Sequence, residues 1–449
     1  MTFRQAMEYI DHLKPVGMQM GLDRMEEILR RLGDPHQRLR TVHIAGTNGK
    51  GSTARMIQAA LTASGYHAAL FSSPAVTGLR DTITIDGRPI GEKSFASCVE
   101  RIRQAADDQN ETIALSEFEV ETALAFLWFC EQRADICVIE CGLGGRDDAT
   151  NVLPAPLLAI LTPVSLDHTA LLGSTAAEIA EVKCGILKKG TGAVITAPGQ
   201  CPEALAEIMA KVAEEGLTLY QPQPGGLEVQ TEEPGNTVFY WRGDLYTLPL
   251  TGRFQAENAM TALQAIECLR AMGWRLPAEA VKMGLAEVVM PCRQEIVRRQ
   301  PLVMLDGAHN PQGIAALAGT LHHLLHGERV TVVMGMLGDK DTTSCVHLLA
   351  PIIKEAICCA PDNPRALAPE LLAAVLQDAG VAASAASSPQ KALERAMSVA
   401  QNGPLLICGS FYLCSVLRPY LTQSGFLRQK NNGSDGGFHV NSVGQASII

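Results

Sequence analysis

The segment best suited to chemistry is a glycine-rich stretch with one lysine, between a buried strand expected at 41–45 and a helix expected at about 51–64. Glycines at such a turn let backbone N–H groups approach phosphate oxygens, and the helix N-terminus adds a favourable partial charge. Lys50 is long enough to reach the β- and γ-phosphates of a nucleotide. The spacing departs from the usual Walker A rule, because Gly51 stands between Lys50 and Ser52. The predicted nucleotide-binding residues are Gly46, Thr47, Asn48, Gly49, Lys50, Gly51 and Ser52.

Two further residues follow predicted strands and could hold a metal. Glu140 ends the strand expected at 135–140, beside a second glycine-rich loop. Carboxylates in such places commonly meet Mg²⁺, which prefers oxygen ligands. His168 follows the strand expected at 157–162. Taken alone, Glu140 fits an acid in a salt bridge and His168 fits a structural histidine, so the residue types leave both alternatives open.

The elements that must position these residues alternate between strands and helices. Apolar runs predict strands at 41–45, 68–72, 135–140 and 157–162, with a helix at 117–132, a pattern typical of an α/β fold with a mainly parallel sheet. Residues 221–250 break the pattern and predict an inserted β-hairpin region. A second α/β unit starts near 302, with strands near 330–334 and 405–408. We predict an ATP-binding domain at 1–295, a second domain at 296–428 and a disordered tail at 429–449.

Composition narrows the function classes. The chain has 449 residues, 47% of them hydrophobic and 19% charged, which is typical of a globular protein of more than one domain. A formal net charge of −10 argues against a general nucleic-acid binder. No apolar run reaches the ~18 residues that a membrane span needs. The 13 cysteines show no CxxC spacing, and reduced thiols in a cytoplasmic protein are the expectation.

A series of short motifs continues along nearly the whole chain. In order, they are Ser72-Ser73-Pro74, Glu140 to Arg146, Asp148 to Asn151, Leu166-Asp167-His168, Ala180 to Lys183, Gly252 to Gln255, Asn258-Ala259, Arg293, Asp306 to Pro311, Gly338 to Asp341, Asp362 to Ala366 and Gly409-Ser410. Together with the phosphate loop, they resemble the motifs of folylpolyglutamate synthases and dihydrofolate synthases within the Mur ligase superfamily. Each motif is weak alone, but their joint order is specific.

The resemblance implies a Mur-ligase-type α/β fold, with an N-terminal P-loop ATPase domain and a Rossmann-like C-terminal domain. ATP and two Mg²⁺ ions would lie between the domains. The implied activity is an ATP-dependent ligase that adds L-glutamate to the γ-carboxylate of a folate through an acyl phosphate. Dihydropteroate as a second acceptor is left open. The expected partners are small-molecule substrates, not nucleic acid or membrane, and the chain is expected to act as a monomer.

The resemblance also assigns roles to residues. It places Ser73, Glu140 and His168 on the metals and makes Lys50, Lys183 and His168 catalytic. Lys183 would carry a carbamate formed with CO₂, because an ammonium cannot ligate a metal whereas a carbamate oxygen can. The ATP contacts would be Asn258 at the adenine, Arg293 at the phosphates and Asp306 at the ribose. His309 and Ser410 would hold glutamate. The folate residues would be Gly21, Leu22, Asp23, Arg24, Phe118, Glu119 and Arg146.

Several positions depart from the family pattern. Ala75 stands where His usually follows Ser-Pro, Asp81-Thr82 stand where Glu-Arg is common, and Asp147 replaces an apolar residue. Phe254 replaces a His and Cys292 a Gly. The first three departures fall around the expected acceptor pocket, so they bear on the choice of acceptor more than on the ligase chemistry.

Two alternatives remain from the sequence. One is another Mur-type ligase acting on a different carboxylate, although the segment 362–365 and the Gly51 insertion favour the folate branch. The other is a non-catalytic nucleotide-binding regulator. The joint presence of Lys50, Glu140, His168 and Lys183 argues against it, because a regulator needs no second metal.

Overall fold

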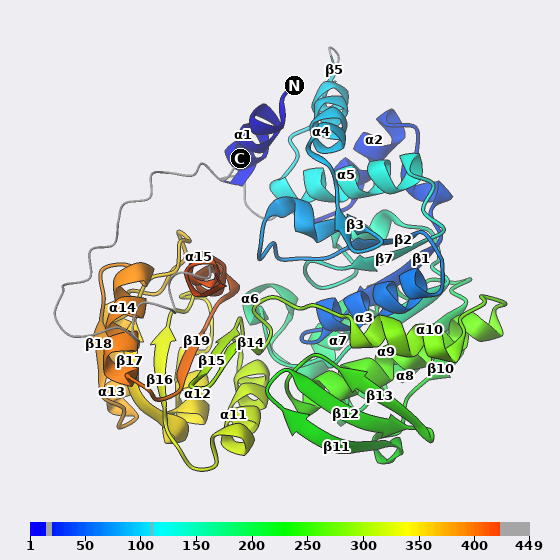
Figure 1. Cartoon of the computed structure of the whole chain (residues 1–449). Coiled ribbons are helices and arrows are strands. Elements are labelled where there is room, and N and C mark those ends of the chain that lie inside the picture. Colours follow the sequence, from blue (N-terminus) through cyan, green and yellow to red (C-terminus); the bar gives the residue numbers. More distant parts are fainter. Residues whose placement is uncertain (15–19, 109–110, 423–449) are drawn as a thin grey trace.

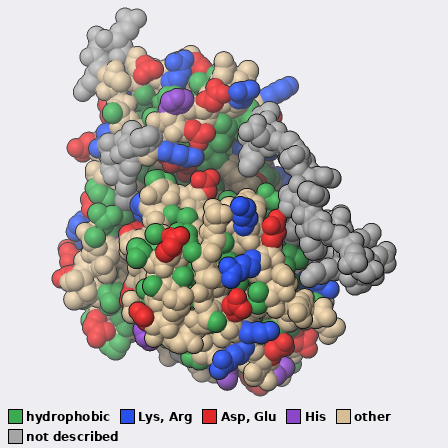
Figure 2. Space-filling model, turned by 90° about the vertical axis from the view of Figure 1, so that its left-hand side faces the viewer, with side chains coloured by type: hydrophobic (Ala, Val, Ile, Leu, Met, Phe, Trp, Pro, Cys, Tyr) green, Lys and Arg blue, Asp and Glu red, His purple; other side chains and the backbone are tan. Residues whose placement is uncertain are grey.

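The computed structural model describes residues 1–14, 20–108 and 111–422. The tail predicted at 429–449 lies outside the described residues. Two α/β units lie side by side, one coloured blue to green and the other yellow to red (Figure 1). Figure 2 views the molecule from the side of the second unit and shows acidic and basic side chains interspersed over that face.

The first unit is built on a sheet of eight strands in the order β10-β9-β8-β1-β7-β2-β3-β4. The strands are β1 Thr41–Ala45, β2 Ala68–Phe71, β3 Ile83–Ile85, β4 Arg88–Pro89, β7 Ile136–Glu140, β8 Leu158–Leu161, β9 Ala193–Thr196 and β10 Leu219–Tyr220. The order from β10 to β2 is parallel, and β3 and β4 form an antiparallel hairpin at the edge. The predicted strands and the mainly parallel sheet are confirmed. A short strand pair, β5 Asp107–Asp108 and β6 Glu111–Thr112, lies outside this sheet.

Helices cover both faces of this sheet. The helices of the first unit are α1 Phe3–Leu13, α2 Asp23–Arg31, α3 Lys50–Ala63, α4 Glu92–Ala106, α5 Glu117–Glu131, α6 Thr169–Leu172, α7 Ala176–Lys183, α8 Pro202–Glu214, α9 Arg253–Ala271 and α10 Ala278–Ala286. Side chains alternate along a strand, so Ile44 of β1 packs with α3 and α9, whereas Ile139 of β7 packs with α4 and α5. The sheet is therefore buried on both faces, as expected for parallel strands.

The inserted region lies within the predicted residues 221–250 but has one strand more than the predicted hairpin. It holds a three-stranded antiparallel sheet, with β11 Leu227–Glu233, β12 Asn236–Trp241 and β13 Asp244–Leu248. Phe239, Trp241 and Tyr246 point into the same core as α9 and α10. The third strand completes an apolar face that a single hairpin would leave half covered.

The second unit contains a six-stranded sheet in the order β14-β15-β19-β16-β17-β18. The strands are β14 Glu295–Arg299, β15 Leu302–Asp306, β16 Val330–Met334, β17 Ile353–Cys358, β18 Ala383–Ala385 and β19 Leu405–Cys408, of which only β14 runs antiparallel to its neighbour. Its helices are α11 Pro311–Leu325, α12 Thr342–Leu349, α13 Pro369–Asp378, α14 Pro389–Ala400 and α15 Phe411–Thr422. The division into domains at 295 stays a prediction.

The cysteines are spread over both units. All 13 are free thiols, and each one except Cys130 and Cys201 is buried. Among the helices in the described ranges, none is both long and apolar enough to cross a membrane.

Candidate active site

The phosphate loop lies between the carboxyl end of β1 and the start of α3. Two of its glycines have positive φ angles, +150° at Gly46 and +83° at Gly49. A Cβ atom at Gly46 would stand 1.8 Å from Thr162 Oγ1, and one at Gly49 would stand 2.4 Å from Asn258 Oδ1. Neither position has room for a side chain, so the loop keeps the bare backbone that a phosphate group can approach. The Lys50 ammonium donates to the carbonyls of Gly46 and Thr47, each at 3.2 Å.

Glu140 ends β7, the strand next to β1 in the sheet. Its side chain is 2% exposed, and Oε2 accepts a hydrogen bond from the backbone N–H of Ser73 at 3.3 Å. Burial raises the pKa of this carboxyl, although Lys50 and Arg293 favour its charged form. A Cβ at Gly51 would lie 3.1 Å from Glu140 Oε2, so the start of α3 passes directly over this carboxylate. The extra glycine after Lys50 therefore has a steric reason.

Lys183, at the end of α7, also contacts the phosphate loop. Its ammonium donates to the carbonyl of Gly46 at 2.7 Å, and the side chain is 3% exposed. Burial, with a further contribution from Lys50, lowers the pKa of Lys183 to about 7. A substantial share of neutral amine is therefore present near neutral pH.

His168 lies at the border between the two units, with a positive φ of 50° at the start of α6. Burial lowers its pKa to about 4, so the imidazole is neutral at physiological pH. Its Nε2 lies 3.3 Å from the ammonium of Lys340. A cationic group of the protein thus lies beside a residue that was predicted to bind a metal.

The predicted metal ligands fit Mg²⁺ only in part. Glu140 and Ser73 lie together and offer the oxygen atoms that this hard cation prefers. Within residues 1–14, 20–108 and 111–422, no cluster of three or more His, Cys, Asp or Glu side chains could hold a metal ion. Other oxygen atoms, from phosphate, water or a modified Lys183, would have to complete each coordination sphere.

A cavity of about 230 Å³ lies between the phosphate loop and the second unit. It is lined by predicted ATP residues of both units: Asn48, Gly49, Ser52, Asn258, Arg293 and Asp306. Phe254, Glu257 and Phe411, which had no predicted nucleotide role, also line it. Arg293 lies over the Phe411 ring, 4.8 Å from its centre. The structure thus brings together residues more than 250 positions apart around a space beside the phosphate loop.

Asp306 does not present a free carboxylate to this cavity. Its two oxygens accept backbone hydrogen bonds from Gln294 at 2.9 Å and Ala308 at 2.6 Å. Burial raises its pKa to about 6. It holds the linker that carries Arg293, a role that the sequence did not predict.

The two predicted glutamate residues follow adjacent strands of the second sheet, β15 and β19. His309 lines the cavity, and its Nδ1 donates to the carbonyl of Gly307 at 2.8 Å. Ser410 is 2% exposed, and its hydroxyl accepts from the backbone N–H of Leu413 at 3.1 Å, near the start of α15. The loops are linked because the N–H of Gly409 donates to the carbonyl of Ala308. The Ser410 hydroxyl accepts a hydrogen bond within the protein and keeps its own O–H as a donor.

The predicted folate residues fall into two places. Arg24 on α2 forms an ion pair with Glu119 on α5 at 2.9 Å, so the segments 21–24 and 116–119 meet. Phe118 stacks on Phe71, with 5.7 Å between ring centres, and covers Gly142 of the loop after β7. Gly21 has a φ of +102° and leads through Leu22 and Asp23 into α2. Arg146 lies apart from this group.

Arg146 is engaged with local acids. Its Nε lies 3.2 Å from Asp147, the acid that departs from the family pattern, and Nη1 lies 3.8 Å from Glu181. All three side chains reach solvent. Asp147 therefore offsets part of the charge that Arg146 could offer to an acceptor.

The two units are joined mainly by residues for which no functional role was predicted. Asp167 pairs with Lys340 at 2.6 Å and accepts from Asn310 at 2.9 Å. Asn48 of the phosphate loop donates to Asn310 at 3.2 Å and to Gln312 at 2.7 Å. Asp167 and Lys340 each belong to a short motif noted in the sequence. The local sequence does not indicate that these two residues, 173 positions apart, are partners.

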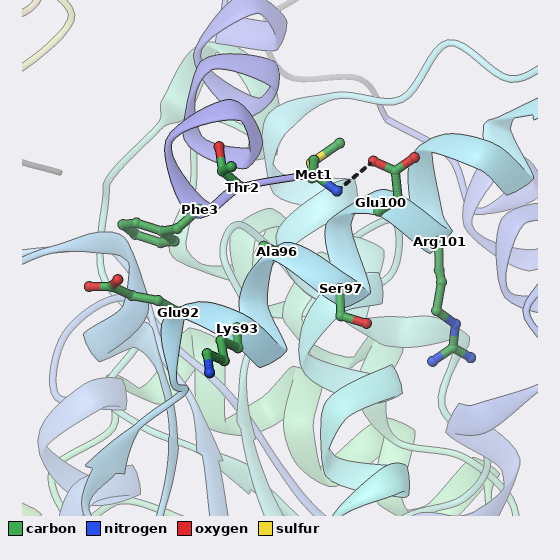
Figure 3. Close-up of a pocket in the computed structure, with 9 residues that line it drawn as sticks. All are labelled: Met1, Thr2, Phe3, Glu92, Lys93, Ala96, Ser97, Glu100 and Arg101. Atoms are coloured by element: carbon green, nitrogen blue, oxygen red, sulfur yellow. Dashed lines mark ion pairs between the residues drawn. The ribbon is translucent and has the colours of Figure 1, made fainter.

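A second cavity of about 470 Å³ lies between the start of α1 and α4 (Figure 3). Its polar lining includes the Met1 ammonium, 3.4 Å from Glu100. None of the predicted site residues lines it.

Two family models match the chain. The Mur ligase middle domain matches residues 44–266, and the Mur ligase glutamate ligase domain matches 292–411. The chain is 34% identical to the dihydrofolate synthase/folylpolyglutamate synthase of Bacillus subtilis, over 94% of this chain and 99% of that protein. It is 33% identical to the folylpolyglutamate synthase of Lacticaseibacillus casei, with the same coverage.

Solved structures agree with this result. Mycobacterium tuberculosis folylpolyglutamate synthase complexed with ADP and AMPPCP superposes with a TM-score of 0.84 at 30% identity, covering 93% of this chain and 99% of that one. Escherichia coli FolC in complex with DHPP and ADP gives a TM-score of 0.82 at 29% identity, covering 94% and 98%. The predicted Mur-ligase-type fold is confirmed.

Proposed function

Because the chain belongs to the family of folylpolyglutamate and dihydrofolate synthases among the Mur ligases, we propose that it joins L-glutamate to the γ-carboxylate of a folate. It is an enzyme, an ATP-dependent acid–amino-acid ligase. The observation that carries this proposal is the convergence of Lys50, Lys183 and Glu140 on the phosphate loop, beside a cavity lined from both units.

The reaction proceeds in two steps. An oxygen of the γ-carboxylate attacks the γ-phosphorus of ATP, the bond from that phosphorus to the bridging oxygen breaks, and ADP leaves. The glutamate nitrogen then attacks the carbonyl carbon of the acyl phosphate, the carbon–oxygen bond breaks, and phosphate leaves with the loss of one amine proton. Lys50 and the N-terminus of α3 stabilise the charge on the phosphate oxygens. Arg293 is proposed to act as a clamp from the linker between the units.

Mg²⁺ is proposed to bind at Glu140 and Ser73, with His168 at a second position. Its chemistry would be to neutralise phosphate charge during transfer. Lys183 is proposed to carry a carbamate: the neutral Nζ attacks CO₂, a nitrogen–carbon bond forms, and one proton leaves to solvent. The burial of Lys183 and its low pKa support this, because only the neutral amine reacts.

The other predicted residues are proposed to bind the three substrates. Gly46, Thr47, Asn48, Gly49, Gly51, Ser52, Asn258 and Asp306 are proposed to surround ATP, with Asp306 acting through the backbone it holds. His309 and Ser410 are proposed for glutamate, and Arg24, Phe118, Glu119 and Arg146 for the folate. The Arg24–Glu119 ion pair supports a shared acceptor site on α2 and α5.

Dihydropteroate is proposed as a second acceptor, because the Bacillus subtilis relative carries both enzyme names and is similar along its whole length. Small molecules, not nucleic acids, are the proposed partners, in keeping with the net charge of −10. We further propose a monomer that works in the cytoplasm, where the free thiols of all 13 cysteines would stay reduced.

An acceptor screen tests the function. Purified enzyme is incubated with ATP, Mg²⁺, L-glutamate and either tetrahydrofolate, dihydropteroate or a cell-wall precursor carboxylate, and phosphate release is compared with the mass of the product. A γ-glutamyl amide of the folate is expected. A glutamyl product with the cell-wall precursor alone would favour another Mur-type ligase, and nucleotide binding without turnover would favour a regulator.

A further inference from the structure

Arg55 lies on the helix that starts at the phosphate loop. It is four residues after Gly51, so both residues share one face of α3. That face passes over the site, because a Cβ at Gly51 would lie 3.1 Å from both Glu140 Oε2 and Arg293 Nη2. Arg55 is half-buried. In the part of the chain that the structure describes, its guanidinium makes no hydrogen bond and no ion pair within 4 Å.

Three charged groups act on Arg55: Arg293 at the nucleotide cavity, Glu140 at the end of β7, and Asp81. Burial and then Arg293 lower its pKa, whereas Glu140 and Asp81 act in the opposite direction. Asp81 belongs to the loop from 72 to 82, whose two ends meet through a hydrogen bond from the N–H of Ser72 to the carbonyl of Thr82 at 2.9 Å. The same loop contacts Glu140 through Ser73. Arg55 therefore lies on the face of α3 that packs against Glu140 at Gly51, and it does not line the nucleotide cavity.

The loop itself offers no cation at this point. Thr82 stands where the family commonly has arginine, and its hydroxyl donates to the carbonyl of Leu79 at 2.7 Å. Arg80, the nearest basic residue in the loop, is directed elsewhere. Its guanidinium lies 3.6 Å from Glu92 and over the ring of Phe3. This loop therefore supplies no guanidinium near Glu140, and another element would have to provide it.

We propose that Arg55 supplies this guanidinium and binds the reactive carboxylate of the acceptor, and then the acyl phosphate formed from it. The inference rests on the proposed ligase function. A guanidinium with five N–H donors and no protein partner suits a planar carboxylate, which it can hold with two parallel hydrogen bonds. Because Gly51, one turn earlier on α3, packs against Glu140, a carboxylate held by Arg55 would lie near the proposed metal and the phosphate loop.

The test separates acceptor binding from nucleotide binding. Arg55→Gln, Arg55→Lys and the double variant Arg55→Gln/Thr82→Arg are compared with the parent for the KM of tetrahydrofolate and of ATP. A lost charge-assisted hydrogen bond predicts a KM for the acceptor raised about 10- to 100-fold in Arg55→Gln, with the KM of ATP unchanged. The acceptor KM of Arg55→Lys should lie between those of the parent and Arg55→Gln, because lysine keeps the charge but cannot form two parallel hydrogen bonds. Arg80→Gln is the matched control and should behave like the parent.

The double variant asks whether Arg55 replaces the missing loop arginine. The added arginine should bring the acceptor KM at least part of the way back toward the parent value. An acceptor KM as high as in Arg55→Gln would overturn that claim. An acceptor KM within twofold of the parent in Arg55→Gln, or an equal rise in the KM of ATP, would overturn the inference. If Arg55→Gln does not fold, the acceptor KM of Arg55→Lys decides the question, provided that this variant melts at the same temperature as the parent. A parent enzyme that ligates no folate overturns the proposed function and this inference together, whereas a parent that ligates and an equally active Arg55→Gln remove only the inference.

Discussion

The carboxylate of Asp167 and the ammonium of Lys340 lie 2.6 Å apart, and they join the loop after β8 to the second α/β unit. Both side chains are at most 10% exposed. Burial opposes the charge on Asp167, but Lys340 and His168 outweigh it and hold the pKa of this carboxyl below its usual range. This buried ion pair between the units therefore depends on pH.

Asp167→Asn should loosen this contact, because the buried ammonium of Lys340 loses its partner. We expect a larger radius of gyration by small-angle scattering in the absence of ligands, and compaction when ATP and folate are added. A depressed carboxyl pKa gives stability above the unfolded pKa, near 4, that is lost as pH falls below it. The parent should thus expand on acidification and the variant should not. Identical scattering of parent and variant at neutral pH would contradict the assignment.

Lys50→Ala should reduce turnover about 100-fold or more, because the transferring phosphoryl group loses its nearest ammonium. The measurement is phosphate release at saturating ATP. Lys93→Ala, which removes an exposed lysine from α4, is the matched control. Near-parent turnover in Lys50→Ala would show that the glycine-rich loop does not hold the phosphates.

Glu140→Gln and His168→Ala should weaken the binding of Mg²⁺ and leave the fold intact. Each removes a proposed ligand, so the Mg²⁺ concentration for half-maximal activity should rise at least tenfold or activity should vanish. His347→Ala, an exposed histidine on α12, serves as the control. If both site variants titrate with Mg²⁺ as the parent does, the metal assignment is wrong.

Lys183→Met should stabilise the unmodified protein. The folded pKa of Lys183 is about 7, below its ordinary value of 10.5, so the folded state binds its proton less tightly than the unfolded chain does. This difference destabilises the folded state. The destabilisation is greatest below pH 7 and disappears as pH rises through 10.5. Removing it should add on the order of 3 kcal/mol to the free energy of unfolding near neutral pH, less the lost hydrogen bond to Gly46. Denaturant unfolding of this variant and of Lys189→Met, an exposed control, measures the difference.

Lys183→Ala should be nearly inactive if the carbamate is needed, and a short carboxylate such as acetate should restore part of the activity. Carbon-13 NMR of the parent with labelled bicarbonate should show a carbamate signal that is missing in the variant. A parent that stays fully active after removal of CO₂, and shows no such signal, would exclude the carbamate.

The sequence predicted the parts of this structure that local pattern determines. Buried apolar runs predicted the central strands β1, β2, β7 and β8 of the first sheet and β15, β16 and β19 of the second, but not β9, β10, β17 or β18. The spacing of Gly46, Gly49 and Lys50 predicted the turn into α3. The third inserted strand was not predicted, although buried positions alternate along β12 and at the end of β13. The pairs Asp167–Lys340 and Asn48–Asn310 could not be predicted, since charge and amide groups this far apart in sequence meet only through the packing of two units. The same holds for Asp306, whose backbone partners appear only in the folded linker.

The buried cysteines give each unit its own chemical reporter. Cys137 and Cys268 lie in the core of the first unit, whereas Cys358 and Cys408 lie in the second sheet. A thiol reagent reaches such residues only when the surrounding structure opens, so its reaction rate at each cysteine measures the free energy of local opening there. Mass spectrometry of the labelled peptides would therefore show which unit opens first, with no cysteine needing to be introduced.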